Sequence, residues 1–304
     1  MALRSTPEAA FEDVPGYDYE TRSVTVDAPG DPEMAYVDVG DGADEDGETF
    51  LCLHGEPTWG FLYRTMIPTL ADRGRVVVPD FLGFGRSDKY TAREEYSYRL
   101  HYESLLAFVE TLDLREVTLV CQDWGGLLGL PVAVEEPERF ARLVPMNTDC
   151  VAGDRELGEA WHEFHEFVES VDELPIGTLI QNGTATELSD AELAAYEAPF
   201  PDEELKAGAY EWPDMVPRPG GGDGAEITSA ARERLAEWDG PAFVLFSDAD
   251  PITRPFRDPL RELIPTASEQ PDVWIEGAAH YLQEDAGAEI AREIVDFVDR
   301  TPVA

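Results

Sequence analysis

The sequence predicts one α/β domain with a mostly parallel sheet, helices on both faces and an inserted helical cap. Short apolar runs alternate with helical stretches along most of the 304 residues, which is typical of parallel strands buried on both faces. This alternation stops between Asn147 and about Asp239 and then resumes. A chain of this length is long enough for one large domain that carries an insertion.

The first two predicted strands form an antiparallel edge of the sheet. Ser23–Val26 and Met34–Val39 are strand-like, and the turn-forming segment Pro29–Pro32 joins them. The later strands, separated by helical stretches, are expected to be parallel. In chain order they are Phe50–Leu53, Arg75–Val78, Val117–Cys121, Leu143–Met146, Phe243–Phe246 and Val273–Ile275.

The segment 148–239 is the predicted helical cap. It contains Trp161, Phe164 and Phe167 and the proline-rich run Ala198–Pro201, but none of the alternation that marks the sheet. Residues 1–147 and 240–304 then form the α/β core.

The composition limits the partners of this protein. The formal net charge is -42, and Lys89 and Lys206 are the only lysines, so nucleic acid is not expected as a partner. Because 43% of the residues are apolar, we interpret the carboxylates as the solvated shell of a folded protein. We infer a host cytosol rich in salt, which screens such self-repulsion. The alternative is that the charge serves solubility alone.

The N-terminal residues have no apolar core of the kind that a secretory signal needs, and no later run approaches the length of a membrane span. We therefore expect a cytoplasmic protein with no membrane association. Cys52, Cys121 and Cys150 are odd in number and widely scattered, which predicts buried free thiols and no disulfide framework. The sequence does not define the oligomeric state and is compatible with a monomer.

The most informative motif is the run Gln122–Gly126, directly after the strand Val117–Cys121. It has the pattern of a nucleophile elbow, a tight turn with small residues between a strand and a helix, and Asp123 occupies the position of the nucleophile. Aspartate is already an anion at neutral pH and attacks without a base. On a saturated carbon, serine would leave an ether that water cannot cleave, whereas aspartate leaves an ester that water can attack. The motif therefore predicts alkyl transfer to a carboxylate, followed by hydrolysis.

An alkyl ester needs a base that activates water and an acid that orients this base. His280 follows the strand Val273–Ile275, at the edge of the sheet where loops form the ligand crevice. Asp250 is the candidate acid, and the order nucleophile, acid, histidine is the one found in α/β-hydrolases. Asp248 is a competing acid, and Asp149 is a weaker one.

The ester also needs donors for its oxyanion. His54–Trp59 follows the strand Phe50–Leu53, and the glycine in this segment allows a turn that aims a backbone N–H at the nucleophile. We assign the oxyanion hole to the backbone N–H groups of Glu56 and Trp124. His54 itself is expected to be a packed loop histidine.

Displacement at a saturated carbon also needs a place for the leaving group. If this group is a halide, it needs N–H donors in a dry pocket, and an indole has a donor without an acceptor. Trp124, beside the nucleophile, is one candidate. A second donor is expected from the cap, where Trp161 is preferred to Trp212. The remaining tryptophans are interpreted as core residues: Trp59, Trp238 and Trp274. His162 and His165 lie three residues apart, but without a third ligand they do not predict a metal site.

Four segments carry a resemblance to a known family. His54–Trp59, Pro79–Asp88 and Gln122–Gly126 together resemble the haloalkane dehalogenases of the α/β-hydrolase superfamily. Within the cap, Ala195–Asp202 is similar to the subgroup that contains the dichloroethane-degrading enzyme. Epoxide hydrolases share looser forms of the first three motifs, but they usually have an aromatic residue at the position of Glu56.

The resemblance implies Asp123 as nucleophile, His280 as base and Asp250 as acid, with Trp124 and a cap tryptophan holding the halide. We therefore expect an enzyme that converts small haloalkanes and water into an alcohol, a halide ion and a proton, without a cofactor or a metal ion. The expected pocket lining is Leu127, Phe164, Trp212, Val216 and Ile252. Epoxide hydrolysis, with Tyr196 or Tyr210 as the proton donor, is the first alternative, and a non-catalytic binding protein on the same scaffold is the second.

Overall fold

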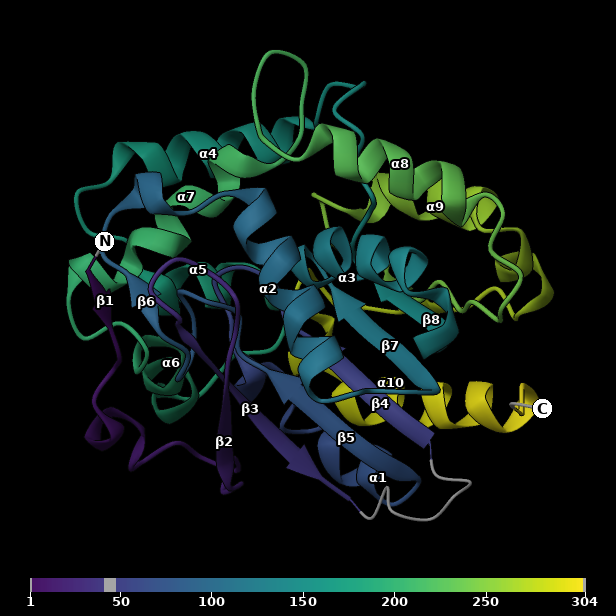
Figure 1. Cartoon of the computed structure of the whole chain (residues 1–304), viewed down its shortest axis with the longest axis horizontal. Coiled ribbons are helices and arrows are strands. Elements are labelled where there is room, and N and C mark those ends of the chain that lie inside the picture. Colours follow the sequence, from purple (N-terminus) through teal and green to yellow (C-terminus); the bar gives the residue numbers. More distant parts are fainter. Residues whose placement is uncertain (1, 41–47, 303–304) are drawn as a thin grey trace.

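A six-stranded sheet lies at the centre of the molecule, in the order β2-β3-β5-β4-β7-β8 (Figure 1). The structure is a computed structural model that describes residues 2–40 and 48–302. Strand β3 is antiparallel to both of its neighbours, and the four strands β5, β4, β7 and β8 are parallel to one another. The strands of this sheet are β2 (Thr21–Thr25), β3 (Glu33–Val39), β4 (Glu48–Leu53), β5 (Gly74–Pro79), β7 (Val117–Gln122) and β8 (Phe140–Met146).

The chain extends this sheet beyond β8. Phe243 N–H donates to the Leu143 carbonyl at 2.8 Å, and Leu245 N–H donates to the Pro145 carbonyl at 3.1 Å. Strand β9 (Phe246–Ser247) then pairs in parallel with β10 (Trp274–Ile275). A separate antiparallel pair joins β1 (Leu3–Arg4) to β6 (Lys89–Tyr90).

The predicted strands are confirmed close to their expected bounds, including the antiparallel edge formed by β2 and β3. One run differs in extent. The run Phe243–Phe246 runs alongside β8 and is hydrogen-bonded to it, but the regular strand β9 begins only at Phe246.

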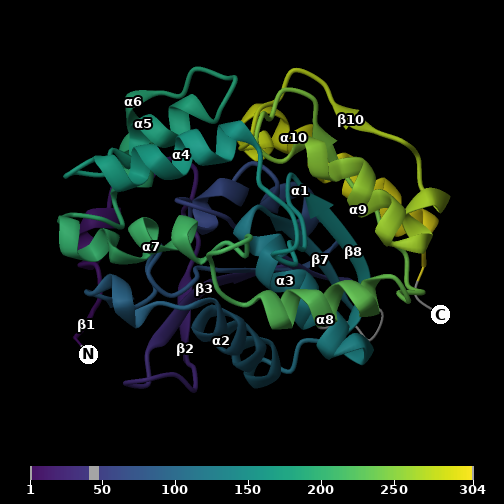
Figure 2. The ribbon, with the colours of Figure 1, turned by 90° about the horizontal axis from the view of Figure 1, so that it is seen from above.

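Helices cover both faces of the sheet. Figure 2 shows α1 and α10 on one face and α2, α3 and α8 on the other. The α-helices are α1 (Ile67–Ala71), α2 (Tyr98–Thr111), α3 (Trp124–Glu135), α4 (Glu159–Ser170), α5 (Ile176–Asn182), α6 (Asp190–Glu197), α7 (Ala207–Met215), α8 (Ala225–Leu235), α9 (Arg257–Leu263) and α10 (Leu282–Arg300). The short 3₁₀ helices are η1 (Glu8–Phe11), η2 (Gly60–Tyr63), η3 (Arg93–Glu95), η4 (Pro137–Arg139), η5 (Glu203–Lys206), η6 (Arg254–Phe256) and η7 (Pro265–Glu269).

The composition of each helix explains its place. Helix α3 is apolar on every side and is buried between the sheet and its neighbours α2 and α8, as expected for a helix with no polar face. Helix α10 is amphipathic and covers the sheet with one face. Ser97 caps the start of helix α2. Its hydroxyl accepts the Leu100 N–H at 3.1 Å, and so satisfies a backbone donor that has no partner within the helix.

Helices α4 to α7 lie together at the end of the sheet where β4 and β7 reach their carboxyl ends (Figure 1). They follow β8 in the chain and interrupt the order of the strands. Helix α8 falls within the predicted cap segment but packs along α3 in the core. The division into core and cap at 147 and 240 stays a prediction.

Both lysines are buried, so the positively charged side chains on the described surface are arginines and not lysines. The Lys89 ammonium donates to the carbonyls of Gly85 and Ser87 at 2.7 and 2.9 Å. The Lys206 ammonium donates to the Leu174 carbonyl at 2.8 Å. Cys52, Cys121 and Cys150 are buried and free, as predicted. Within residues 2–40 and 48–302, no helix has the length and apolarity needed to cross a bilayer.

Candidate active site

Asp123 lies in the tight turn between β7 and α3. Its φ of 51° and ψ of −122° are costly for a residue with a side chain and are held by close packing around the turn. A Cβ atom on Gly125 would lie 2.2 Å from the Leu53 carbonyl oxygen, and one on Gly126 would lie 2.2 Å from Thr148 Oγ1. The small residues that follow the nucleophile are therefore required for the turn to form.

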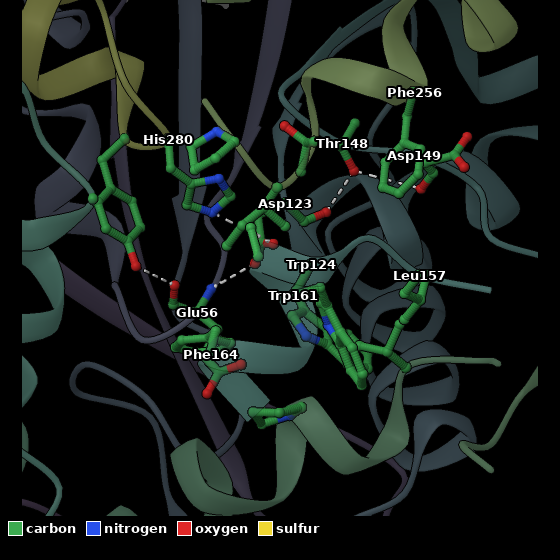
Figure 3. Close-up of a pocket in the computed structure, with 18 of the residues that line it drawn as sticks. Glu56, Asp123, Trp124, Thr148, Asp149, Leu157, Trp161, Phe164, Phe256 and His280 are labelled. Atoms are coloured by element: carbon green, nitrogen blue, oxygen red, sulfur yellow. Dashed lines mark hydrogen bonds and ion pairs between the residues drawn. The ribbon is translucent and has the colours of Figure 1, made fainter. Parts of the chain in front are cut away.

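His280 bridges the other two predicted members of the triad (Figure 3). Its Nδ1 lies 2.9 Å from Asp250 Oδ2, and its Nε2 lies 3.6 Å from Asp123 Oδ1. Asp250 is completely buried, and it accepts a 2.9 Å hydrogen bond from the Ile252 N–H and another from the Thr253 hydroxyl. The structure thus brings together an aspartate, a histidine and a second, fixed aspartate from three separate loops.

Neither rival acid contacts His280. Asp248 is exposed, and its Oδ1 accepts the Gly277 N–H at 2.7 Å. Asp149 is buried in an ion pair with Arg155. In Figure 3 its carboxylate points away from Asp123.

The charges of the site shift the pKa values of its members. Burial raises the pKa of Asp123, while His280 and the N–H groups of Glu56 and Trp124 oppose this rise. Burial alone would lower the pKa of His280, but the charges of Asp250 and Asp123 outweigh it and raise the pKa to about 9. For Asp250, burial is outweighed by His280 and the hydrogen-bond donors, which lower its pKa. The resting site therefore favours an imidazolium between two carboxylates.

The two predicted oxyanion donors both favour the charged nucleophile. The Glu56 backbone N–H donates to Asp123 Oδ2 at 2.9 Å, and the Trp124 backbone N–H acts to lower the pKa of the same carboxyl group. Gly55 allows this approach, because a Cβ there would lie 2.4 Å from Asp123 Cβ. His54 is fully buried, and its Nε2 accepts the Phe81 N–H at 3.0 Å. Burial lowers the pKa of His54 to about 3, which leaves it a neutral packed residue.

A cavity of about 600 Å³ opens over Asp123 between the core and the helices that follow β8. Apolar side chains dominate its lining, and Figure 3 shows Leu157, Trp161, Phe164 and Phe256 around it. Four of the five predicted lining residues belong to it: Leu127, Phe164, Val216 and Ile252. A cavity of this size and polarity is typical of a small-molecule site.

Trp124 and Trp161 both line this cavity. Within the described residues, neither indole N–H has a hydrogen-bond partner. The other indoles are engaged or lie elsewhere. Trp59 Nε1 donates to the Ala195 carbonyl at 3.0 Å, Trp238 is buried outside the cavity, and Trp274 packs under the Arg257 guanidinium at 4.1 Å.

The prediction that Trp212 lines the pocket is wrong. Trp212 is completely buried behind the cavity wall, and its ring centroid lies 4.8 Å from that of Trp124. Its indole N–H donates to His101 Nε2 at 2.7 Å. Pro213, near the end of α7, and Val216, which follows this helix, face the cavity instead.

Several polar residues around the nucleophile were not singled out from the sequence. The Thr148 hydroxyl donates to the Asp123 carbonyl at 2.6 Å. The Asn147 amide donates to the carbonyls of Ala279 and His280, both at 3.0 Å. The Gln122 amide nitrogen lies 3.2 Å from His280 Nε2. All three lie at or just after the carboxyl ends of β7 and β8. Their position at the ends of these strands in the sequence could have identified them as site residues.

The two histidines of α4 both contact Trp161 and belong to no metal site among the described residues. His165 Nε2 pairs with Asp214 Oδ1 at 2.7 Å and stacks on Trp161. Throughout residues 2–40 and 48–302, no group of three or more His, Cys, Asp or Glu side chains is arranged to hold a metal ion.

Comparison with known proteins agrees with this geometry. Residues 48–286 match the model of the α/β hydrolase fold. A haloalkane dehalogenase of Psychrobacter cryohalolentis is 40% identical over 305 residues, which cover 99% of this chain and 100% of that relative. The chain belongs to the haloalkane dehalogenase family. The fold and the family predicted from the sequence are confirmed.

Other members of the haloalkane dehalogenase family give the same result. Haloalkane dehalogenase 1 of Mycobacterium tuberculosis is 41% identical over 302 residues, which cover 99% of this chain and 100% of that relative. The tetrameric haloalkane dehalogenase DpaA from Paraglaciecola agarilytica NO2 has a similar structure, with a TM-score of 0.89 at 37% identity over 96% of this chain and 97% of that chain. The subgroup resemblance of the cap stays a prediction.

Proposed function

We propose that this protein hydrolyses carbon–halogen bonds in small haloalkanes through an alkyl ester of Asp123. The observation that carries this proposal is a carboxylate at a nucleophile elbow, facing an apolar cavity in which the indoles of Trp124 and Trp161 have no other partner. A carboxylate nucleophile suits displacement at saturated carbon, because the ester that it forms remains open to water.

In the first step, Asp123 Oδ1 attacks the carbon that bears the halogen. The carbon–halogen bond breaks, and the halide leaves with the electron pair toward Trp124 and Trp161. Oδ1 faces His280, whereas Oδ2 is held by the Glu56 N–H, so the two oxygens have different roles. Indole N–H donors in a dry cavity stabilise a weakly hydrated anion that water would otherwise hold.

Ester formation removes the charge of Asp123, one of the charges that raise the pKa of His280, and the imidazolium can then lose its proton to solvent. In the second step, water attacks the ester carbon of Asp123 and passes a proton to Nε2 of the neutral His280. The carbonyl electron pair moves to Oδ2, where the N–H groups of Glu56 and Trp124 stabilise the charge. The tetrahedral intermediate then collapses as the bond between Cγ and Oδ1 breaks, and the alcohol leaves with the proton from His280. The restored carboxyl group of Asp123 ionises and releases the remaining proton. Haloalkane and water have become alcohol, halide and a proton, with no cofactor.

Epoxide hydrolysis is the less favoured alternative, because it needs a tyrosine hydroxyl aimed at the substrate. The two candidates, Tyr196 and Tyr210, donate their hydroxyls to Glu284 and Glu203, and neither lines the cavity. Mixing the protein with 1,2-dibromoethane or 1-bromobutane and measuring bromide tests the proposal. Bromide release supports it, and diol formation from 1,2-epoxybutane without any bromide release would favour the alternative.

We further propose that the protein works in a salt-rich cytoplasm. The net charge of -42 and the burial of both lysines support this, because self-repulsion on such a surface destabilises the folded state unless ions screen it.

A further inference from the structure

Tyr281 follows the base directly and is buried among three parts of the site. Its hydroxyl donates to the Glu56 carbonyl at 2.8 Å, and its ring lies edge-on to the His280 ring at 4.9 Å. Its backbone N–H donates to the carbonyl of Gly183, just after α5, at 3.0 Å. One residue therefore connects the loop of the base, the loop of the oxyanion donor and a helix that covers the cavity.

The hydrogen bond from Tyr281 acts on the residue that donates to the nucleophile. Glu56 accepts from Tyr281 through its carbonyl and donates to Asp123 Oδ2 through its own N–H at 2.9 Å. Backbone atoms on both sides of the Glu56 Cα are therefore fixed, one by the tyrosine and one by the nucleophile. Burial and the neighbouring carboxylates raise the pKa of Tyr281 well above its usual range, so the hydroxyl remains protonated and can only donate to this carbonyl.

We infer that Tyr281 is a positioning residue that holds the Glu56 N–H at the site of the oxyanion and so favours hydrolysis of the alkyl ester over its formation. The inference rests on the proposed function. During ester formation, the charge of Asp123 is spread over the carboxylate and then lost, so that precise placement of a donor matters little. During hydrolysis, a full negative charge develops on Oδ2, and a donor must already be in place.

The variant Tyr281→Phe removes one oxygen atom and preserves the ring. Rapid mixing with 1,2-dibromoethane, followed by quenching and intact-mass measurement, gives the rate of each step. We expect ester formation to change by less than about twofold and hydrolysis to slow by about tenfold, less than the roughly 10²–10³-fold cost of deleting an oxyanion donor itself. The alkylated enzyme should therefore accumulate during turnover.

Tyr90→Phe is the matched control. The Tyr90 hydroxyl also donates to a backbone carbonyl, that of Pro29, at 2.8 Å, and Tyr90 does not line the cavity. This variant loses the same kind of bond and should keep both rates. If Tyr90→Phe and Tyr281→Phe slow both steps equally, the effect is general loosening of the fold and the inference is wrong.

Gly183→Ala tests the same contact while keeping the hydroxyl. A Cβ at this position would lie 2.5 Å from Tyr281 Cε2, so the ring must move away and take its hydroxyl with it. Selective slowing of hydrolysis in this variant supports the inference. If the rate of hydrolysis is unchanged in both Tyr281→Phe and Gly183→Ala, the inference about Tyr281 is wrong. The proposed function does not depend on this result, because bromide release by the wild-type protein tests it separately.

Discussion

His280 Nε2 lies 3.6 Å from Asp123 Oδ1, which is longer than a hydrogen bond but close enough for an ion pair. In a serine hydrolase the histidine must hydrogen-bond to the nucleophile, because it removes the proton before attack. An aspartate has no proton to remove. The base of this site is needed only after the ester has formed, when it must take a proton from water.

Replacing His280 by phenylalanine should separate the two steps. Asp123 can still attack, but no base activates water, so the enzyme should gain the mass of one alkyl group on incubation with 1,2-dibromoethane. Intact-mass spectrometry measures this gain. Asp123→Ala is the control and should gain no mass. An unchanged mass of His280→Phe with a substrate that the wild type turns over would contradict the assignment.

Asp250→Asn should impair hydrolysis of the ester far more than Asp248→Asn. The Asp250 carboxylate accepts from His280 Nδ1 at 2.9 Å, whereas Asp248 lies on the same loop, is exposed and does not contact the base. The equivalent amide substitution in a Ser-His-Asp triad lowers turnover roughly 10⁴-fold, and we expect a loss of that order here. Steady-state bromide release compares the two variants, and equal losses would argue against Asp250 as the orienting acid.

Chloride or bromide should quench tryptophan fluorescence saturably, and Trp161→Phe should weaken halide binding by about tenfold, the effect of losing one charge-assisted hydrogen bond. Trp238→Phe also removes one indole, but this residue lies outside the cavity, so the halide dissociation constant should stay as in the wild type. A Trp161→Phe protein that binds bromide with wild-type affinity would exclude Trp161 as a donor.

The His280 imidazole should titrate near pH 9 in the resting enzyme and at a lower pH in Asp123→Asn. The charge of Asp123 is one of the causes that raise the pKa of His280, so removing that charge must lower it. Ester formation removes the same charge and so lowers the pKa of His280, and the imidazolium then loses its proton to solvent and becomes a base. NMR of the His280 ring protons against pH measures both midpoints, and identical midpoints would show that Asp123 has no influence on His280.

The thermal unfolding midpoint should rise as potassium chloride is increased from millimolar to molar concentrations. At a net charge of -42, carboxylates repel across a Debye length of about 30 Å at 0.01 M, which falls to about 3 Å at 1 M. Chloride also binds the proposed halide site and stabilises the fold by mass action. Potassium glutamate, whose anion is too large for that site, isolates the screening effect. A midpoint that is flat or falls in both salts would remove the inference of a salt-rich cytoplasm.

The sequence by itself determined the strands, the elbow and the order of the catalytic groups. Asp123, Asp250 and His280 each follow an apolar strand, and the carboxyl ends of parallel strands meet at one edge of the sheet. Local chemistry was enough for these residues: two glycines after Asp123 allow a turn that a Cβ would block. The order of the groups fits Asp248 as well as Asp250, and only the resemblance favoured Asp250. The contact with His280 that decides between them needed the structure.

Only the tertiary structure decided which residues of the helices after β8 face the cavity. Trp161 and Trp212 are both tryptophans on short helices, and nothing in their neighbours tells where an indole N–H points. Packing directs the Trp212 N–H to His101 and leaves that of Trp161 free in the cavity. The contact between Tyr281 and Glu56 joins residues 225 positions apart. Such orientations depend on how helices from distant parts of the chain pack against the sheet, which periodicity cannot encode.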